Sequence, residues 1–206
     1  MIPLEEEKFY HVYNRGNDGV DLFYQLRNYT YFLNKYDYYL SDYVETYAYN
    51  LLPNHFHLLI RVRQKIEFVE RKEEFPTRLD LERLSAGEIV SELFRRFFMS
   101  YSKSINIQQN RTGSLFQKNF RRKLVGNMSY FTSLVYYIHN QLKHHGFSNL
   151  DDTDYPWSSY QKFLLQRDSK LRKKEVLEWF GGVEEFIKFH SLNHNMQHIE
   201  NLMIEL

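Results

Sequence analysis

The run from Leu51 to Ile60 constrains the fold more than any other part of the chain. Two apolar stretches flank Pro53-Asn54, and the second stretch begins with His55-Phe56-His57. A proline followed by an asparagine favours a tight turn, so we expect the two stretches to pair as an antiparallel hairpin. Side chains alternate faces along a strand, and both imidazoles therefore project from one side while Phe56 enters the packed layer. Two imidazoles on one face indicate a metal site that lacks its third ligand.

The order of predicted elements around this hairpin is typical of one fold class. Strands are predicted at 9–14, 43–51, 55–63 and 115–124, and helices at 29–40, 90–105 and 127–142. Alternating aromatic and β-branched residues indicate the strands, and apolar residues at helical spacing indicate the helices. Without the last helix the order is βαββαβ, the ferredoxin-like arrangement of the α+β class, with helices on one face of an antiparallel sheet. The other face of the sheet is then expected to be open to a ligand.

The chain is long enough for one main domain and an appendage. With 206 residues, 43% of them hydrophobic, we assign residues 1–150 to a working domain and residues 151–206 to a helical extension packed on it. The charged stretch 64–87 is predicted to be a long connection or insertion. No apolar run approaches the length of a membrane-spanning helix, and the first residues contain neither a basic leader nor an apolar segment of the kind found in signal peptides. A cytoplasmic protein without a membrane partner is therefore expected.

Cysteine content and charge narrow the chemistry. The chain has no cysteine, which excludes disulfides and thiolate ligands, so any metal is held by nitrogen and oxygen and is magnesium, manganese or zinc. The net charge is only +1, but no Asp or Glu occurs between Glu92 and Asp151, and nine basic residues fall in that interval. Such a stretch suits a solvated basic face, and it also suits a surface that binds phosphates.

The helix predicted at 127–142 carries candidates for a third ligand and for a nucleophile. Tyr136 and Asn140 lie off its apolar stripe and, being four residues apart, share a face with about 6 Å between them along the axis. A carboxamide oxygen can complete a magnesium or manganese site that two imidazoles have begun, and a tyrosine beside it can act as a nucleophile. Tyr137 competes for that role, but the helical phase turns it away from Asn140. The apolar stripe that we expect to pack on the sheet consists of Phe131, Leu134, Val135, Ile138 and Leu142.

Five motifs in order now suggest a family. They are Tyr10-His11-Val12-Tyr13-Asn14-Arg15-Gly16, Leu52-Pro53-Asn54-His55-Phe56-His57, Gly113-Ser114-Leu115-Phe116-Gln117, Tyr136-Tyr137-Ile138-His139-Asn140 and Tyr155-Pro156-Trp157-Ser158-Ser159-Tyr160. Together they span residues 8 to 160 and resemble the single-tyrosine transposases of the HUH endonuclease superfamily, in particular the REP-associated tyrosine transposases. One departure is visible, because Gln141 follows Asn140 where the family usually has proline.

The resemblance implies a nuclease and strand transferase that acts on single-stranded or hairpin DNA with Mg²⁺ or Mn²⁺. His55, His57 and Asn140 would be metal ligands, and Tyr136 would form a 5′-phosphotyrosine bond and release a 3′-hydroxyl. Residues 1–150 would then be the transposase domain. A monomer is favoured, although related transposases work as homodimers that exchange the tyrosine helix. Candidate DNA contacts are His11, Arg15, Arg111, Lys118, Arg121, Arg122, Lys123 and Lys143.

Two other functions remain open at this point. A four-stranded sheet with an exposed aromatic face also suits a module that binds single-stranded DNA or RNA without cleaving it. A metal-dependent hydrolase would use the same histidines to activate water, and Tyr136 would then be incidental. The product separates the two enzymes: a strand linked to the protein in one case, and two free ends in the other.

Overall fold

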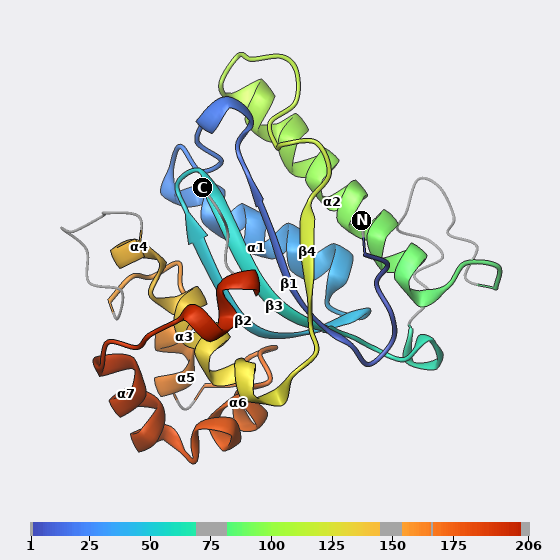
Figure 1. Ribbon diagram of the computed structural model, residues 1–206. Helices are drawn as coiled ribbons and strands as arrows, with labels where there is room; N and C mark the ends of the chain where they lie inside the picture. Colours follow the sequence, from blue (N-terminus) through green and yellow to red (C-terminus); the bar gives the residue numbers. More distant parts are fainter. Residues whose placement is uncertain (1, 69–81, 145–153, 166, 203–206) are drawn as a thin grey trace.

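A four-stranded antiparallel sheet forms the centre of the computed structural model, which describes residues 2–68, 82–144, 154–165 and 167–202 (Figure 1). The sheet has the spatial order β2-β3-β1-β4. Its elements are β1 (Phe9–Arg15), α1 (Leu26–Leu40), β2 (Val44–Leu52), β3 (His55–Val62), α2 (Ala86–Gln108) and β4 (Arg121–Val125). This βαββαβ order with β1 and β3 in the middle is the ferredoxin-like arrangement, and the predicted fold class is confirmed.

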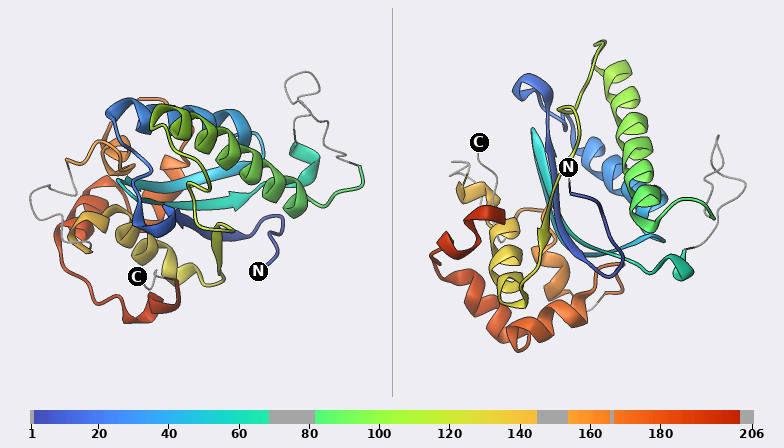
Figure 2. Two further views of the ribbon diagram at one scale, coloured as in Figure 1. Left: turned by 90° about the horizontal axis from the view of Figure 1, so that it is seen from above. Right: turned by 45° about the vertical axis from the view of Figure 1, so that its right-hand side comes forward.

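One face of the sheet is covered by α1 and α2, as the sequence predicts (Figure 2). Alternate residues of β1 and β3, including Tyr10, Val12 and Phe56, point into this layer and are buried. The helix α2 begins at a capping box, in which the Ser85 and Glu88 side chains each accept a hydrogen bond from the backbone N–H of the other residue. The larger of the two main hydrophobic clusters lies between these helices and the sheet.

The opposite face is covered as well, which corrects the expectation that it is open to a ligand (Figure 2). The layer on this face contains α3 (Phe131–His139), α4 (Gln141–His144), α5 (Tyr160–Leu164), α6 (Lys173–Phe180) and α7 (Val183–Ser191). Aromatic rings fill the contact: Phe9 of β1 lies 4.5 Å from Phe131 of α3 between ring centroids, and Phe131 stacks on Trp179 of α6 at 4.6 Å. This layer removes the exposed sheet face on which a simple nucleic-acid-binding module of this fold would depend.

The chain after residue 154 also closes one edge of the sheet. The backbone of β2 bonds to that segment, with Leu51 N donating to Trp157 O at 3.0 Å, Ser159 N to Tyr49 O at 2.9 Å and Arg172 N to Thr46 O at 2.9 Å. The outer groups of β2 are therefore satisfied, and β4 forms the other edge. The helical extension is thus an integral layer of the fold.

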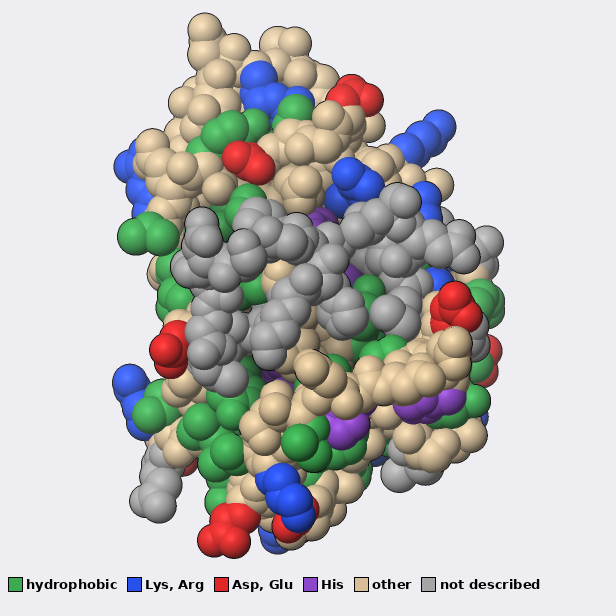
Figure 3. All heavy atoms as spheres, turned by 60° about the vertical axis from the view of Figure 1, so that its left-hand side comes forward, with side chains coloured by type: hydrophobic (Ala, Val, Ile, Leu, Met, Phe, Trp, Pro, Cys, Tyr) green, Lys and Arg blue, Asp and Glu red, His purple; other side chains and the backbone are tan. Residues whose placement is uncertain are grey.

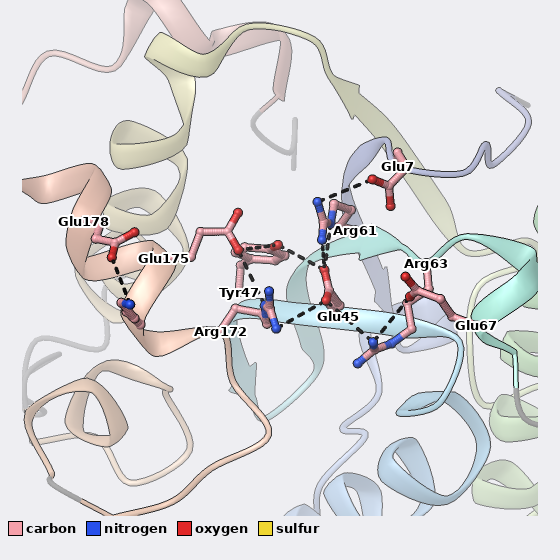
Figure 4. A network of polar contacts seen from close by, with 10 residues as sticks. Glu7, Glu45, Tyr47, Arg61, Arg63, Glu67, Arg172, Glu175 and Glu178 are labelled. Carbon is pink, nitrogen blue, oxygen red and sulfur yellow. Dashed lines mark hydrogen bonds and ion pairs between the residues drawn. The ribbon is translucent and has the colours of Figure 1, made fainter.

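A buried carboxylate ties the same segment to the sheet (Figure 4). Glu45 of β2 is 5% exposed and lies 2.6 Å from Arg61, 3.5 Å from Arg172 and 3.7 Å from Arg63. The hydroxyl of Tyr47 lies 3.0 Å from Glu175 of α6, and burial together with the Glu45 charge raises the pKa of this tyrosine. Three guanidinium groups around one buried carboxylate compensate its loss of hydration.

Helices α1 and α2 are longer than predicted, and two other predicted elements are shortened or divided. The last strand is predicted from Leu115 but begins at Arg121, because Leu115 and Phe116 are buried as part of a loop that packs on the core. The predicted helix 127–142 is interrupted at Asn140 and continues as α4. The boundary at residue 150 and most of the predicted insertion 64–87 lie outside the described residues. Within the part of the chain that is described, no helix is long and apolar enough to cross a membrane.

Candidate functional site

The histidines of β1 and β3 lie on the sheet face that is covered by α3. Cross-strand partners share a face, and the register pairs Tyr13 with His57 and Arg15 with His55. His11, His55 and His57 therefore project toward α3, and all three are buried. The predicted pair of imidazoles on one face is thus present, and His11 joins it as a third. Histidine side chains reach the surface at several points of the molecular face that carries α3, α4 and α7 (Figure 3).

Each histidine of the motif is held through its Nδ1 atom. Nδ1 of His55 lies 2.7 Å from Oδ1 of Asn54, and Nδ1 of His57 lies 2.9 Å from Nε2 of His11. An amide oxygen can only accept a hydrogen bond, so Nδ1 of His55 is the donor and carries the ring proton, which leaves the lone pair on Nε2. The same tautomer of His57 results when His11 accepts from it. Held in this way, both Nε2 atoms, which are buried, are the ring atoms suited to bind a metal.

Asn50 positions the end of α3 over these histidines. It is the register partner of His57 on β2, and its Nδ2 donates to the carbonyl oxygens of Ile138 at 2.8 Å and His139 at 3.3 Å. These two carbonyls belong to the last turn of α3, where the carbonyl oxygens have no intrahelical N–H group to accept from. The buried amide of Asn50 thus fixes the end of α3 in position over the sheet.

Tyr137 is the tyrosine of α3 that faces the histidines. Its ring centroid lies 5.7 Å from that of His57 and 6.0 Å from that of His11, with the rings edge-on in both cases. Tyr13 of β1 is also close, with its ring 5.0 Å from His11 and 6.3 Å from His57. Neither tyrosine was predicted as a site residue from the sequence.

The structure does not bring Tyr136 to the histidines. Its hydroxyl donates to the carbonyl oxygen of Leu192 at 2.9 Å, and its ring lies against Phe189 and, at 4.8 Å, His194. The helix α3 is buried on two sides, by the sheet and by α7, so a residue off its apolar stripe can face α7 instead of the histidines, as Tyr136 does. The sequence contains a second tyrosine–carboxamide pair with the same four-residue spacing, Tyr137 with Gln141, and this pair could have indicated the tyrosine that faces the histidines.

Two carboxamides follow at the junction of α3 and α4. Nδ2 of Asn140 donates to the carbonyl oxygen of Tyr136 at 2.9 Å, and Nε2 of Gln141 donates to that of Tyr137 at 2.6 Å. Both side chains are buried. Both residues follow the end of α3, so each carboxamide is placed by the carbonyl that it bonds, that of Tyr136 for Asn140 and that of Tyr137 for Gln141.

A second histidine pair holds α3 from its other side. Nδ1 of His139 lies 2.9 Å from Nε2 of His190 in α7, and its Nε2 lies 2.8 Å from Oγ of Ser159. Burial, with a smaller contribution from His190, lowers the pKa of His139 well below its ordinary value. His139 is therefore neutral near pH 7, and its bonds to His190 and Ser159 join α3 to the extension.

A metal ion at this site would need a third ligand that is neither a histidine nor a carboxylate. Over the described ranges, no three side chains of His, Cys, Asp or Glu come together in a way that could hold an ion. The donors that fit are Nε2 of His55 and His57 with one carboxamide oxygen, a nitrogen and oxygen set that suits Mn²⁺ or Mg²⁺.

The predicted DNA contacts divide between two surfaces. Arg121 and Lys123 pair with Tyr13 and His11 in the register, and with Arg15 they lie on the α3 face. The remaining side chains that can be placed, Arg111, Lys118 and Arg122, line a groove beside α2. His11 is fully buried, so it is no surface contact. The side chain of Lys143 is outside what the structure describes.

A solved structure shares this fold. The structure of a REP-associated tyrosine transposase bound to a REP hairpin matches with a TM-score of 0.56 over 81% of this chain and 84% of that chain, at 15% sequence identity. No protein-family model and no curated protein matches the chain. At this identity the likeness establishes the α+β architecture, and the family suggested by the motifs stays a prediction.

Proposed function

We propose that this chain is a divalent-metal-dependent transposase, or a domesticated relative of one, that cleaves and rejoins single-stranded or hairpin DNA through a covalent tyrosine intermediate. The observation that carries the proposal is the ring of Tyr137 edge-on to His57 and His11 beneath the end of α3. The five motifs in order and the fold shared with a transposase that is bound to a DNA hairpin support it.

Each residue of the site has a distinct role in this proposal. His55 and His57 hold Mg²⁺ or Mn²⁺ through Nε2, because Asn54 and His11 occupy their Nδ1 atoms. Gln141 would supply the carboxamide oxygen, in place of the predicted Asn140, because its side chain is bonded to the carbonyl oxygen of Tyr137 and that of Asn140 to the carbonyl oxygen of Tyr136. When bound, the ion polarises the scissile phosphate and stabilises charge on the departing oxygen.

The nucleophile in this proposal is Tyr137 instead of Tyr136. Its phenolic oxygen gives up its proton and attacks the phosphorus, the bond from phosphorus to the 3′ oxygen breaks, and that oxygen takes up one proton as a free 3′-hydroxyl, so no net proton is gained or lost. The 5′ end stays linked to the tyrosine. One phosphodiester replaces another, so the reverse attack by a 3′-hydroxyl rejoins a strand without a nucleotide energy source. Tyr136 is less suited, since its hydroxyl is bonded to Leu192 on the far side of α3.

A denaturing gel tests the function and the choice of tyrosine together. The wild-type protein is incubated with Mn²⁺ and end-labelled single strands that form hairpins, and a covalent protein–DNA adduct is expected. Tyr137→Phe and His57→Ala should abolish the adduct, whereas Tyr136→Phe and Tyr13→Phe, which remove the same atom from neighbouring positions, should retain it. An adduct lost only in Tyr136→Phe returns the role to the residue predicted from the sequence.

The same gel separates the other functions. Cleavage into two free ends that persists in all three tyrosine variants means a metal-dependent hydrolase. Binding without cleavage in any condition means a module that only recognises single-stranded DNA or RNA. Either result refutes the proposed transferase. Size measurements of the free protein decide between the favoured monomer and a homodimer.

A further inference from the structure

A groove runs along α2 on the side of the sheet away from the histidines. It has a volume of about 1120 Å³ and is lined by α2 and by the segment that leads into β4. Figure 1 shows the course of α2 and of this segment. Ser91 and Ile107 mark its ends on the helix. At 1.5 Å per residue these positions are about 24 Å apart, which is room for roughly seven stacked nucleotides at 3.4 Å each.

The charge of the groove suits a polyanion. No Asp or Glu is among its lining residues, although the whole chain carries nearly equal numbers of acidic and basic residues. Arg122 is fixed by hydrogen bonds to Ile2 O at 2.6 Å and to Oγ of Ser91 at 3.0 Å. Lys103 and Lys118 are exposed on opposite sides of the groove, one on α2 and one on the loop. The basic residues that line it are Arg95, Lys103, Arg111, Lys118 and Arg122.

The groove also offers groups that recognise bases. The guanidinium of Arg122 lies 5.1 Å above the ring of Phe120, which makes a partly exposed stacking platform. Asn110 and Asn119 adopt left-handed backbone angles, with φ of 49° and 65°, and shape the loop that borders the groove. Both asparagines are exposed, and their amides can both donate to and accept from base edges.

The far end of the groove reaches the edge of the histidine site. Asn14 lines the groove and is followed on β1 by Arg15, the register partner of His55. The loop is joined there, since Gln117 N donates to Arg15 O at 2.9 Å. A strand lying in the groove therefore leads around the end of β1 to the side where the histidines lie.

We propose that this groove binds a single-stranded segment of the DNA substrate, with phosphates against the basic side chains and bases against Phe120 and the carboxamides. The inference rests on the proposed function only in taking DNA as the substrate. Exposed carboxamides, a partly buried ring and dispersed cations favour an unpaired strand over a duplex, which presents a continuous charged backbone and hides its base faces.

Binding of hairpins with flanks of increasing length tests this assignment. Full-length Tyr137→Phe protein is titrated, without added metal, into labelled DNA hairpins that share one stem and carry unpaired flanks of different length. Affinity should rise with flank length and level off near seven nucleotides. Lys103→Glu combined with Lys118→Glu should weaken binding of the flanked hairpin at least tenfold and leave the flank-free hairpin unchanged. For the flanked hairpin, the slope of the logarithm of the binding constant against the logarithm of the salt concentration should become shallower by about 1.4. Each lost single-strand phosphate contact accounts for about 0.7 of this change.

A matched control and four outcomes make the test decisive. Lys174→Glu with Lys188→Glu changes the net charge equally on exposed positions of α6 and α7 and should leave binding unchanged. An equal loss for the flank-free hairpin would place the stem in the groove, and an unchanged affinity would show that the groove is not used. Tighter binding of an RNA flank than of a DNA flank would mean that RNA is the ligand. Each of these overturns the inference. An absent covalent adduct with intact flank dependence overturns only the proposed chemistry.

Discussion

Replacing His11 should weaken metal binding even though His11 is not proposed as a ligand. Its Nε2 lies 2.9 Å from Nδ1 of His57, and both rings are fully buried. In His11→Leu the free protein can place the proton of His57 on Nε2, but metal binding at Nε2 requires it on Nδ1, where a buried donor without its acceptor costs about 1–3 kcal/mol. Since 1.4 kcal/mol is tenfold, this corresponds to roughly 5- to 140-fold in the dissociation constant, which overlaps the range of about 10–100-fold typical for partners of metal-binding histidines.

Calorimetric titration with Mn²⁺ measures this effect on the free protein. His11→Gln should recover most of the affinity, because a glutamine oxygen can occupy the place of Nε2 and accept the same hydrogen bond. His198→Leu, which removes a histidine bonded to Oγ of Ser133 outside the site, should bind Mn²⁺ as the wild type does. Nitrogen NMR of the imidazoles should show His57 protonated at Nδ1 in the wild type and in His11→Gln. An unchanged affinity in His11→Leu, or a glutamine variant as weak as the leucine variant, would refute the reasoning.

Three further predictions follow from the packing of α3. Phe186→Ala should lower the free energy of unfolding in urea by about 3–5 kcal/mol, since this α7 side chain is fully buried. The control Ile187→Ala, at a side chain that is 44% exposed, should lower it by under about 1 kcal/mol. A small loss for Phe186→Ala would contradict a core shared by α3 and α7. Because burial depresses the pKa of His139, the unfolded chain binds more protons below about pH 6.5, so stability should fall as pH decreases from there, and His139→Gln should flatten that slope in urea titrations at several pH values. Mixing Tyr137→Phe with His57→Ala chains should not restore the DNA adduct, because α3 packs on its own sheet; restoration would show exchange of the helix between chains.

The hairpin and the direction of its histidines could be predicted from local sequence. The Pro53-Asn54 turn and the alternation in His55-Phe56-His57 depend only on near neighbours, and the structure pairs β2 with β3 and buries Phe56 opposite the histidines. Local periodicity is enough to predict which way a side chain points wherever one face of an element is buried and the other is not.

The direction of the tyrosine could not be predicted in the same way. Tyr136 with Asn140 and Tyr137 with Gln141 have identical spacing, so the choice depended on which side of the helix is polar. That criterion fails for α3, which has no solvent-facing side between the sheet and α7: Tyr136 is 4% exposed and Tyr137 3%. The contact between His11 and His57 joins residues 46 positions apart and needs the strand order, which periodicity does not report.

The closure of β2 by the chain after residue 154 has a consequence for synthesis. During translation the ribosome releases the four strands and α3 before the segment that satisfies the outer groups of β2 and covers the back of α3. Until that segment emerges, the nascent chain presents an unpaired strand edge and a helix with an uncovered apolar side, two features that favour wrong association. The sheet edge at β2 and the back of α3 are therefore completed only after the segment that follows residue 154 has been synthesised.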